Sequence, residues 1–316
     1  MNPQEPLPVS ETTFVPAVEV TPPVAPGPQK KMGKFKASRM LVRESLNVLK
    51  RDKELSWFPV LSGIASLAAL IVFVGAVFFV VMGGDIQTYT QFSNTNEQLN
   101  ANGYLILFVY YLLVFFIANY FLAGMYTIVH ARFIGKDLSL SEGIANANKH
   151  VGRIFVWSLI SATVGIVLRI ISDKSRIIGK IVAAVFGAAW GILTYFSLPS
   201  LVIGERTIKE SFKESASVIR KTWGETIIVN FGVGLFFGLI TFAVIAVMVG
   251  IALLVPVMEI FILLGVLFVI YIVVLSIISS TLSSIVKCAL YEYATTGNVP
   301  QGFTPELIRG AVKSGK

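Results

Sequence analysis

Hydrophobic residues along this chain gather into long uninterrupted runs separated by polar segments. The first run, from Trp57 to Met82, contains no charged residue in 26 positions. A helix of about 20 apolar residues is long enough to cross the hydrocarbon core of a bilayer. The pattern predicts six membrane-spanning helices, over approximately 57–82, 104–129, 154–171, 181–203, 227–254 and 260–286.

A turn is predicted between the last two spans. Between Glu225 and Lys287 lie 61 residues whose only charge is Glu259. A single helix of this length would extend about 90 Å, roughly three times the hydrocarbon thickness. Pro256 interrupts the helical hydrogen bonds, and a charge at membrane depth is costly. We therefore expect the chain to turn within 255–259.

The polar segments ahead of the span pairs repeat a pattern. RESLNVLKRD (43–52) and KESASVIRKT (213–222) share the order basic, Glu, Ser, then Val, an aliphatic residue and a basic residue. A weaker stripe, from Ile144 to Val151, precedes the middle pair of spans. The sequence thus predicts an all-α integral membrane helical bundle, with about six transmembrane helices in three hairpins, each preceded by a cytoplasmic amphipathic helix.

Each amphipathic segment is expected to lie in the headgroup layer of the membrane. The apolar stripes that would enter the bilayer are Val42, Ser45, Leu46 and Leu49, and Phe212, Ser215, Ala216 and Ile219. Basic residues lie beside these stripes and attract anionic lipid. The predicted anionic-lipid contacts are Arg43, Lys50, Arg51, Lys213, Arg220 and Lys221.

The distribution of basic residues predicts the orientation. If both termini are cytoplasmic, 22 of the 26 Lys and Arg residues fall on the cytoplasmic side. This excess obeys the positive-inside rule. The exception is the loop RIISDKSRIIGK (169–180), whose four basic residues would face outside. Either spans three and four cross fully, which we expect, or they form a shallow hairpin.

The polar ends of the chain are predicted to be tails. Residues 1–31 are rich in proline and lack the basic and apolar regions of a signal peptide, so we expect a disordered cytoplasmic tail. A helical transmembrane domain is expected over 32–290, and a cytoplasmic C-terminal tail over 291–316.

Composition narrows the classes of function. The chain is 55% hydrophobic and 14% charged, which places it in a bilayer. The net charge of +8 comes from residues at the ends of apolar runs, so nucleic-acid binding is not expected. One cysteine, Cys288, and two histidines leave little for a disulfide framework, a metal or another cofactor. No nucleotide-binding or hydrolase motif occurs, and we expect no enzymatic activity.

Polar residues within the spans are the candidates for a functional path. Asn119 is the deepest of them, and the last span carries Ser276, Ser280 and Ser283. Such residues either hydrogen-bond between helices or line a polar route. Two hypotheses follow: a non-enzymatic protein that organises the membrane, mediates interactions or serves envelope homeostasis, and a transporter or permease for a small or amphiphilic solute.

Three stretches carry a family resemblance: RDKELSWFPVLSGI, then AAWGILTYFSLPSLVIGERTIKESFKESASVIRKTWGETIIVNFGVG, and LYEYATTGNVPQGFTPE. Over roughly 38–312 the chain resembles a prokaryotic multi-pass membrane protein family known as domain of unknown function 6159. The resemblance implies an integral protein of a prokaryotic cell membrane without an assigned activity. It brings no site residues, and it leaves open whether the partner is a second copy or another membrane protein.

Overall fold

Described residues of the computed structural model are 34–81, 83, 101–175, 177–254, 257–305 and 308, with side chains except at 34–39, 80–81 and 221–236. All of them belong to one unit, Met32–Lys316. The predicted tail over 1–31 lies outside them. Within this part of the chain the structure contains nine α-helices and no strand, which confirms the all-α prediction.

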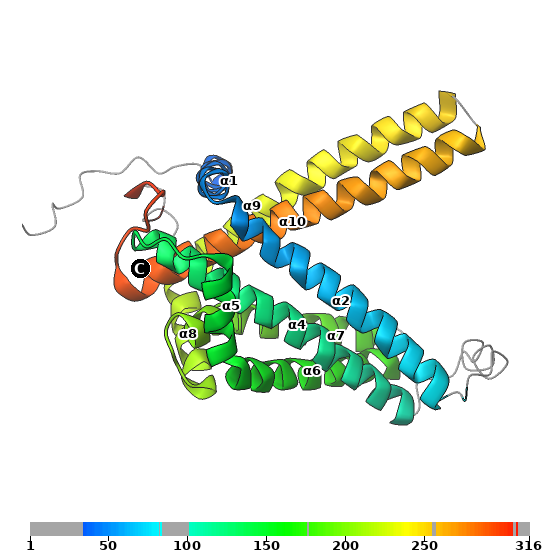
Figure 1. The fold of residues 1–316 in the computed structure, drawn as a ribbon, viewed down its shortest axis with the longest axis horizontal. Coiled ribbons are helices and arrows are strands. Elements are labelled where there is room, and N and C mark those ends of the chain that lie inside the picture. The colour runs from blue at the N-terminus through cyan, green and yellow to red at the C-terminus, as the bar shows by residue number, and fades with distance from the viewer. Residues whose placement is uncertain are drawn as a thin grey trace, which may run out of the picture. The chain divides into compact units, whose positions relative to one another are not determined.

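Apart from residues 84–100, which precede α4 and lie outside the described part of the chain, the helices follow one another with short connections (Figure 1). A 3₁₀ turn at Lys53–Ser56 joins the first two, and the second continues into a π-helical segment, Val77–Val81. The α-helices are α1 (Lys34–Arg51), α2 (Trp57–Ala76), α4 (Ala101–Phe133), α5 (Leu140–Lys149), α6 (Val151–Lys174), α7 (Ile178–Leu193), α8 (Ser197–Val202), α9 (Ile208–Leu254) and α10 (Met258–Thr296).

The prediction of six spans is confirmed at the level of length and composition. Within the described residues six helical segments are long and apolar enough to cross a membrane. The predicted turn between the last two is also confirmed, because α9 ends at Leu254 and α10 begins at Met258. The six segments are Lys53–Phe79, Ala101–Phe133, Val151–Lys174, Ile178–Val202, Phe237–Leu254 and Met258–Thr296.

The fourth predicted span is not one continuous helix. It breaks after Leu193, and α8 begins at Ser197. Ser215 of α9 fills the break: its hydroxyl donates to the Leu193 carbonyl at 2.6 Å and accepts from the Phe196 N–H at 3.0 Å. The side chain of another helix thus satisfies backbone groups that an unbroken helix would pair internally. All six residues of α8 are buried.

The fifth span and its amphipathic segment also differ from the expectation. A separate helix on the membrane surface was predicted, but α9 runs without interruption from Ile208 to Leu254, about 70 Å. The middle amphipathic helix, α5, ends at Lys149, two residues earlier than its stripe predicted. Val151 therefore belongs to α6, where it is 41% exposed.

The apolar stripes of α1 and α9 contact protein, so the prediction that they enter the headgroup layer is wrong. Leu41, Ser45 and Val48 are buried on α1, which packs against α9 and α10. Their counterparts in the repeat, Ser211, Ser215 and Val218, are buried on α9. The repeat thus buries the same positions in both copies.

Aromatic packing explains the burial on α9. Phe212 lies 5.1 Å from Trp157 of α6 and 5.4 Å from Trp190 of α7, measured between ring centroids. The two tryptophans stack on each other at 6.3 Å. Such ring pairs add to the stability gained from their buried area. The beginning of α9 is therefore held against the third and fourth spans.

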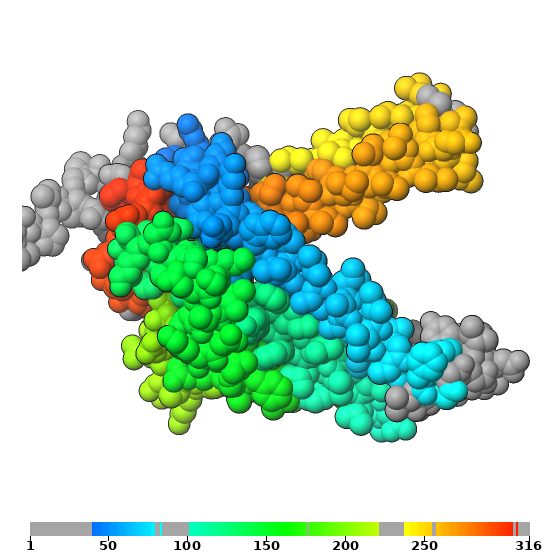
Figure 2. Space-filling model, in the orientation of Figure 1, coloured from blue at the N-terminus to red at the C-terminus, as the bar shows by residue number. Residues whose placement is uncertain are grey.

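The core lies where the polar ends of the helices meet. Its buried residues come mainly from α8 and the final turns of α4 and α10, with smaller contributions from α1, α5, α6 and α9. Away from this region the spans expose large apolar side chains, as lipid contact requires. In Figure 2, α2 and α4 lie side by side, as do the outer halves of α9 and α10.

The C-terminal boundary predicted at residue 290 falls inside α10. The helix continues to Thr296, and Gly297 ends it with a left-handed φ of 78°. The chain then folds back, where Phe303 packs on Phe133 with ring centroids 5.8 Å apart. Thr304 donates its N–H to the Glu44 carboxylate of α1 at 3.2 Å. Residues 291–305 therefore belong to the packed domain rather than to a tail.

Candidate functional site

The polar residues predicted within the spans do not lie together along one polar path through the membrane. Asn119 of α4 donates from Nδ2 to Ser158 Oγ of α6 at 3.0 Å, so it links two helices. Ser276 and Ser280 are exposed on α10, and Ser283 is half-buried. No hydrogen bond joins Asn119 to these three serines within the described part of the chain. The arrangement of Asn119 is that of a helix-packing contact.

The predicted lipid-binding cations form exposed faces. Arg43, Lys50 and Arg51 are exposed on α1, while the opposite face of that helix is buried. Lys213 and Arg220 are exposed on α9. The side chain of Lys221 lies outside the described residues. Each basic face therefore belongs to a helix whose position is fixed by packing against protein.

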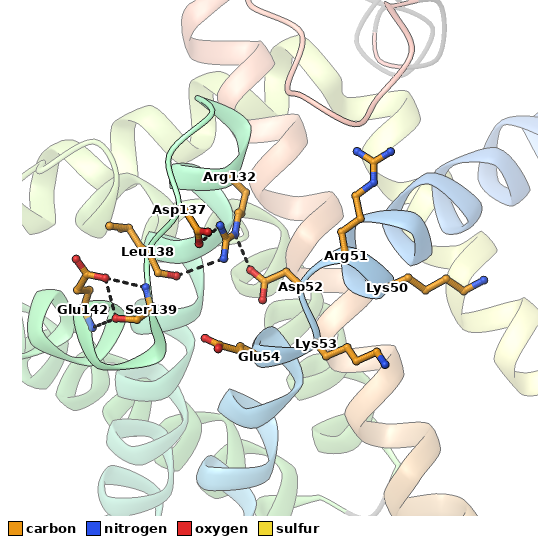
Figure 3. A pocket seen from close by; sticks show the side chains of 10 residues that line it. All are labelled: Lys50, Arg51, Asp52, Lys53, Glu54, Arg132, Asp137, Leu138, Ser139 and Glu142. Atoms are coloured by element: carbon orange, nitrogen blue, oxygen red, sulfur yellow. Dashed lines mark hydrogen bonds and ion pairs between the residues drawn. The ribbon is translucent and has the colours of Figure 1, made fainter.

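A polar pocket of about 550 Å³, here called the α1–α4 pocket, opens where α1 ends. Its walls come from the end of α1, the 3₁₀ turn, the end of α4 and the α4–α5 connection (Figure 3). The side chains that line it are Lys50, Arg51, Asp52, Lys53, Glu54, Arg132, Asp137, Leu138, Ser139 and Glu142.

Arg132 lies at the base of this pocket and contacts three other residues that line it. Its Nε donates to Oδ2 of the buried Asp52 at 2.7 Å, its Nη1 pairs with Asp137, and its Nη2 donates to the Leu138 carbonyl at 3.5 Å. A buried carboxylate without such a partner would be strongly unfavourable. The pair therefore fixes the end of α1 to the end of α4.

A capping box forms the far wall. The Ser139 N–H and hydroxyl donate to Glu142 Oε2 at 2.8 and 2.7 Å, and the Glu142 N–H donates back to Ser139 Oγ at 3.4 Å. Hydrogen bonds from the backbone and hydroxyl of Ser139 lower the pKa of the Glu142 carboxyl. Thr207 and Glu210 repeat the arrangement at the start of α9, where the pKa of Glu210 is lowered in the same way.

A second pocket, of about 400 Å³, lies between the start of α9 and the end of α10. Glu214 forms its inner edge, with Oε2 accepting from the Ser200 and Tyr291 hydroxyls, the latter at 3.2 Å. Arg206 Nε lies 3.5 Å from the same oxygen. Glu214 is therefore occupied by three groups of its own chain, and it ties α8, α9 and α10 together.

Among the described residues, no group of three His, Cys, Asp or Glu side chains is placed to hold a metal ion. Of the two histidines, His130 has Nδ1 3.0 Å from Glu292 Oε2, a distance that allows an ion pair when the ring is protonated. The same nitrogen is not aligned for a hydrogen bond. His150 Nδ1 contacts the Asn146 carbonyl at 2.9 Å.

Sequence reasoning missed Asp52, Arg132 and Glu214. One sequence signal was available for Glu214, because the repeat places Glu44 at the equivalent position on α1. In the structure both carboxylates accept hydrogen bonds from the C-terminal part of the chain, Glu214 from Tyr291 and Glu44 from Thr304. The capping boxes were readable as Ser139-x-x-Glu142 and Thr207-x-x-Glu210. No local signal could pair Asp52 with Arg132, which are 80 positions apart.

Comparison with known proteins identifies a family but no relative of known structure. No curated protein and no solved structure matches this chain. Residues 101–302, from the start of α4 to just beyond α10, match the family of unknown function DUF6159. The match covers most of the chain but leaves out α1 and α2. The chain belongs to the family of unknown function DUF6159.

Proposed function

We propose that this protein is a non-enzymatic membrane protein that organises anionic lipid at the cytoplasmic face of a prokaryotic cell membrane. The observation that carries the proposal is the exposure of Arg43, Lys50 and Arg51 on a helix whose apolar side is buried in protein. Lys213 and Arg220 are presented in the same way on α9.

These basic residues can attract anionic lipid efficiently because the helices that carry them are held in place. A basic residue near an anionic membrane surface contributes about 1 kcal/mol of attraction. Because α1 and the start of α9 pack on other helices, their cations stay at fixed positions beside the spans. Such a helix gathers anionic headgroups around the protein without inserting its own apolar stripe, unlike a free amphipathic helix.

The proposed orientation places both termini in the cytoplasm, as the positive-inside rule favours. A contact between α4 and α6 supports a full crossing by the third and fourth spans. The Tyr104 hydroxyl, near the beginning of α4, donates to Asp173 Oδ2, near the end of α6, at 3.3 Å. The α6–α7 turn therefore reaches the same level as the predicted outer end of the second span. There Arg169 pairs with Asp173 at 3.0 Å, which reduces the cost of a basic loop outside.

The test measures the lipid retained by the purified full-length protein. Wild type and the variant R43Q/K213Q/R220Q are extracted from membranes of equal composition, and bound lipids are quantified by mass spectrometry. We expect the ratio of phosphatidylglycerol to phosphatidylethanolamine to fall severalfold in the variant, because three exposed cations are lost. The matched control is K174Q/K180Q. It removes two exposed cations next to the α6–α7 turn, one from the end of α6 and one from the start of α7. An unchanged ratio in the first variant would refute the proposed role.

A further inference from the structure

The α1–α4 pocket lies beside an apolar surface. Glu54, which lines the pocket, precedes α2 by only three positions. Trp57, at the start of α2, is 55% exposed, and Ile64 and Ile71 are exposed further along the helix. A ligand with a polar end in the pocket would therefore find an apolar surface for its remainder. An amphiphile satisfies both regions.

Four of the charged groups that line the pocket already have partners within their own chain. Arg132 is shared between Asp52 and Asp137. Glu142 is engaged by Ser139 in the capping box. These groups form a fixed polar floor and wall, because each has a partner in its own chain. The charges available to a ligand are the remaining four.

The available charges are separated in space. Lys50, Arg51 and Lys53 lie on the α1 side, whereas Glu54 points toward the capping box (Figure 3). All four are exposed, and none takes part in an ion pair within the residues that the structure describes. A ligand that complements them carries both an anionic group and a cationic group.

We infer that the α1–α4 pocket binds the headgroup of an aminophospholipid, with the phosphate on the side of Lys50 and Lys53, the ammonium beside Glu54, and the acyl chains along α2. A primary ammonium offers three N–H donors to carboxylates, and a phosphate accepts from basic side chains. The pocket volume of about 550 Å³ lies within the usual range for small-ligand sites.

A purely anionic headgroup fits the pocket less well. The lining contains four basic and four acidic residues, so a negative ligand gains no net attraction from the lining as a whole. This inference uses the same orientation in the membrane as the proposed function, but it does not depend on the anionic-lipid contacts of α9. The two can therefore fail separately.

Native mass spectrometry of the purified full-length protein tests the site. The protein, delipidated in detergent, is titrated with equal amounts of phosphatidylethanolamine and phosphatidylglycerol. We expect wild type to retain one phosphatidylethanolamine preferentially. E54Q should weaken the binding of phosphatidylethanolamine about tenfold, the effect of losing one charged hydrogen bond. The binding of phosphatidylglycerol should be unchanged or stronger. E54D should restore the preference.

Controls separate a pocket effect from a general effect of charge. E259Q removes an exposed acid in the first turn of α10, outside the pocket, and should leave the preference intact. K50Q/K53Q should weaken the binding of phosphatidylethanolamine, whereas K174Q/K180Q should leave it unchanged. Soluble glycerophosphoethanolamine should compete poorly, because it lacks the acyl chains that contact α2.

Three results would overturn the inference. The first is phosphatidylethanolamine binding that E54Q does not weaken, which indicates that Glu54 does not hold the ammonium. The second is equal effects of E54Q and E259Q. The third is competition by glycerophosphoethanolamine as strong as by the lipid, which indicates a soluble ligand. None of these results depends on R43Q/K213Q/R220Q, the variant that tests the proposed function.

Discussion

Two serines at equivalent positions of the internal repeat have different roles. Ser45 of α1 and Ser215 of α9 are both fully buried. Ser215 makes two hydrogen bonds to the break between α7 and α8. The Ser45 hydroxyl is buried without a hydrogen-bond partner among the described residues. The repeat has therefore kept the small side chain in both copies, but only one hydroxyl stabilises the fold by hydrogen bonding.

The substitution S215A should destabilise the protein by about 2 kcal/mol, because it leaves the Phe196 N–H and the Leu193 carbonyl buried and unpaired. S45A should be neutral or slightly stabilising, because it removes a buried polar group that has no partner. Thermal unfolding of the two purified variants in the same detergent measures the difference.

S217A is the matched control for S215A, since Ser217 is exposed on the same helix. Hydrogen exchange gives a local readout, and amides around Phe196 should exchange faster in S215A alone. Equal stability of S215A and S217A would show that Ser215 does not hold the break between α7 and α8.

At the scale of elements, α4 and α5 pack closely against each other through two glycines. An added Cβ at Gly143 would lie 2.9 Å from the Gly124 carbonyl oxygen. An added Cβ at Gly124 would meet Phe58 of α2 at 2.7 Å. Small residues at both positions thus allow three helices to approach one another near the α1–α4 pocket.

G143A should therefore destabilise the protein by about 1–3 kcal/mol, the usual cost of overpacking, because the Gly124 backbone must move. G152A is the matched control: an added Cβ there meets nothing within 4 Å, and alanine favours a helix over glycine. Chemical or thermal unfolding compares the two. A G143A protein as stable as G152A would contradict the close packing of α4 and α5.

The sequence predicted those helices and turns whose positions depend on the local pattern of residues. It did not predict the features that depend on a contact with a distant part of the chain. Length and hydropathy predicted six spans and the turn before Met258. They could not show the break after Leu193, since a side chain of α9 stabilises it. An amphipathic stripe indicates an apolar partner without identifying it, so the α1 stripe was assigned to lipid although it packs on protein. The exposed side of the same helix was predictable, and it includes Lys50 and Arg51.

The whole molecule divides into a packed end and lipid-facing spans. Buried residues gather at α1, α8 and the ends of α4 and α10, and the outer parts of the spans expose their apolar side chains. In the proposed orientation the packed end is cytoplasmic, and both pockets open there. The fold thus concentrates its fixed polar chemistry on one side of the membrane.

Cysteine labelling tests this orientation. Cys288 is buried, so the native chain should react little with an impermeant thiol reagent. K174C, at the end of α6, should be labelled in intact cells, because we place the α6–α7 turn outside. K149C, at the end of α5, should be labelled only after permeabilisation. Both positions are exposed, so they form a matched pair. Labelling of K174C only after permeabilisation would favour the shallow hairpin.

The break after Leu193 has a consequence for how the fourth span crosses the bilayer. With 16 residues, α7 is about 24 Å long, shorter than a hydrocarbon core of about 30 Å. The turn after Leu193 and α8 therefore complete the fourth span, Ile178–Val202. Lipid offers no hydrogen bonds to an interrupted backbone, so the Ser215 hydroxyl and the burial of α8 make a broken span compatible with the membrane.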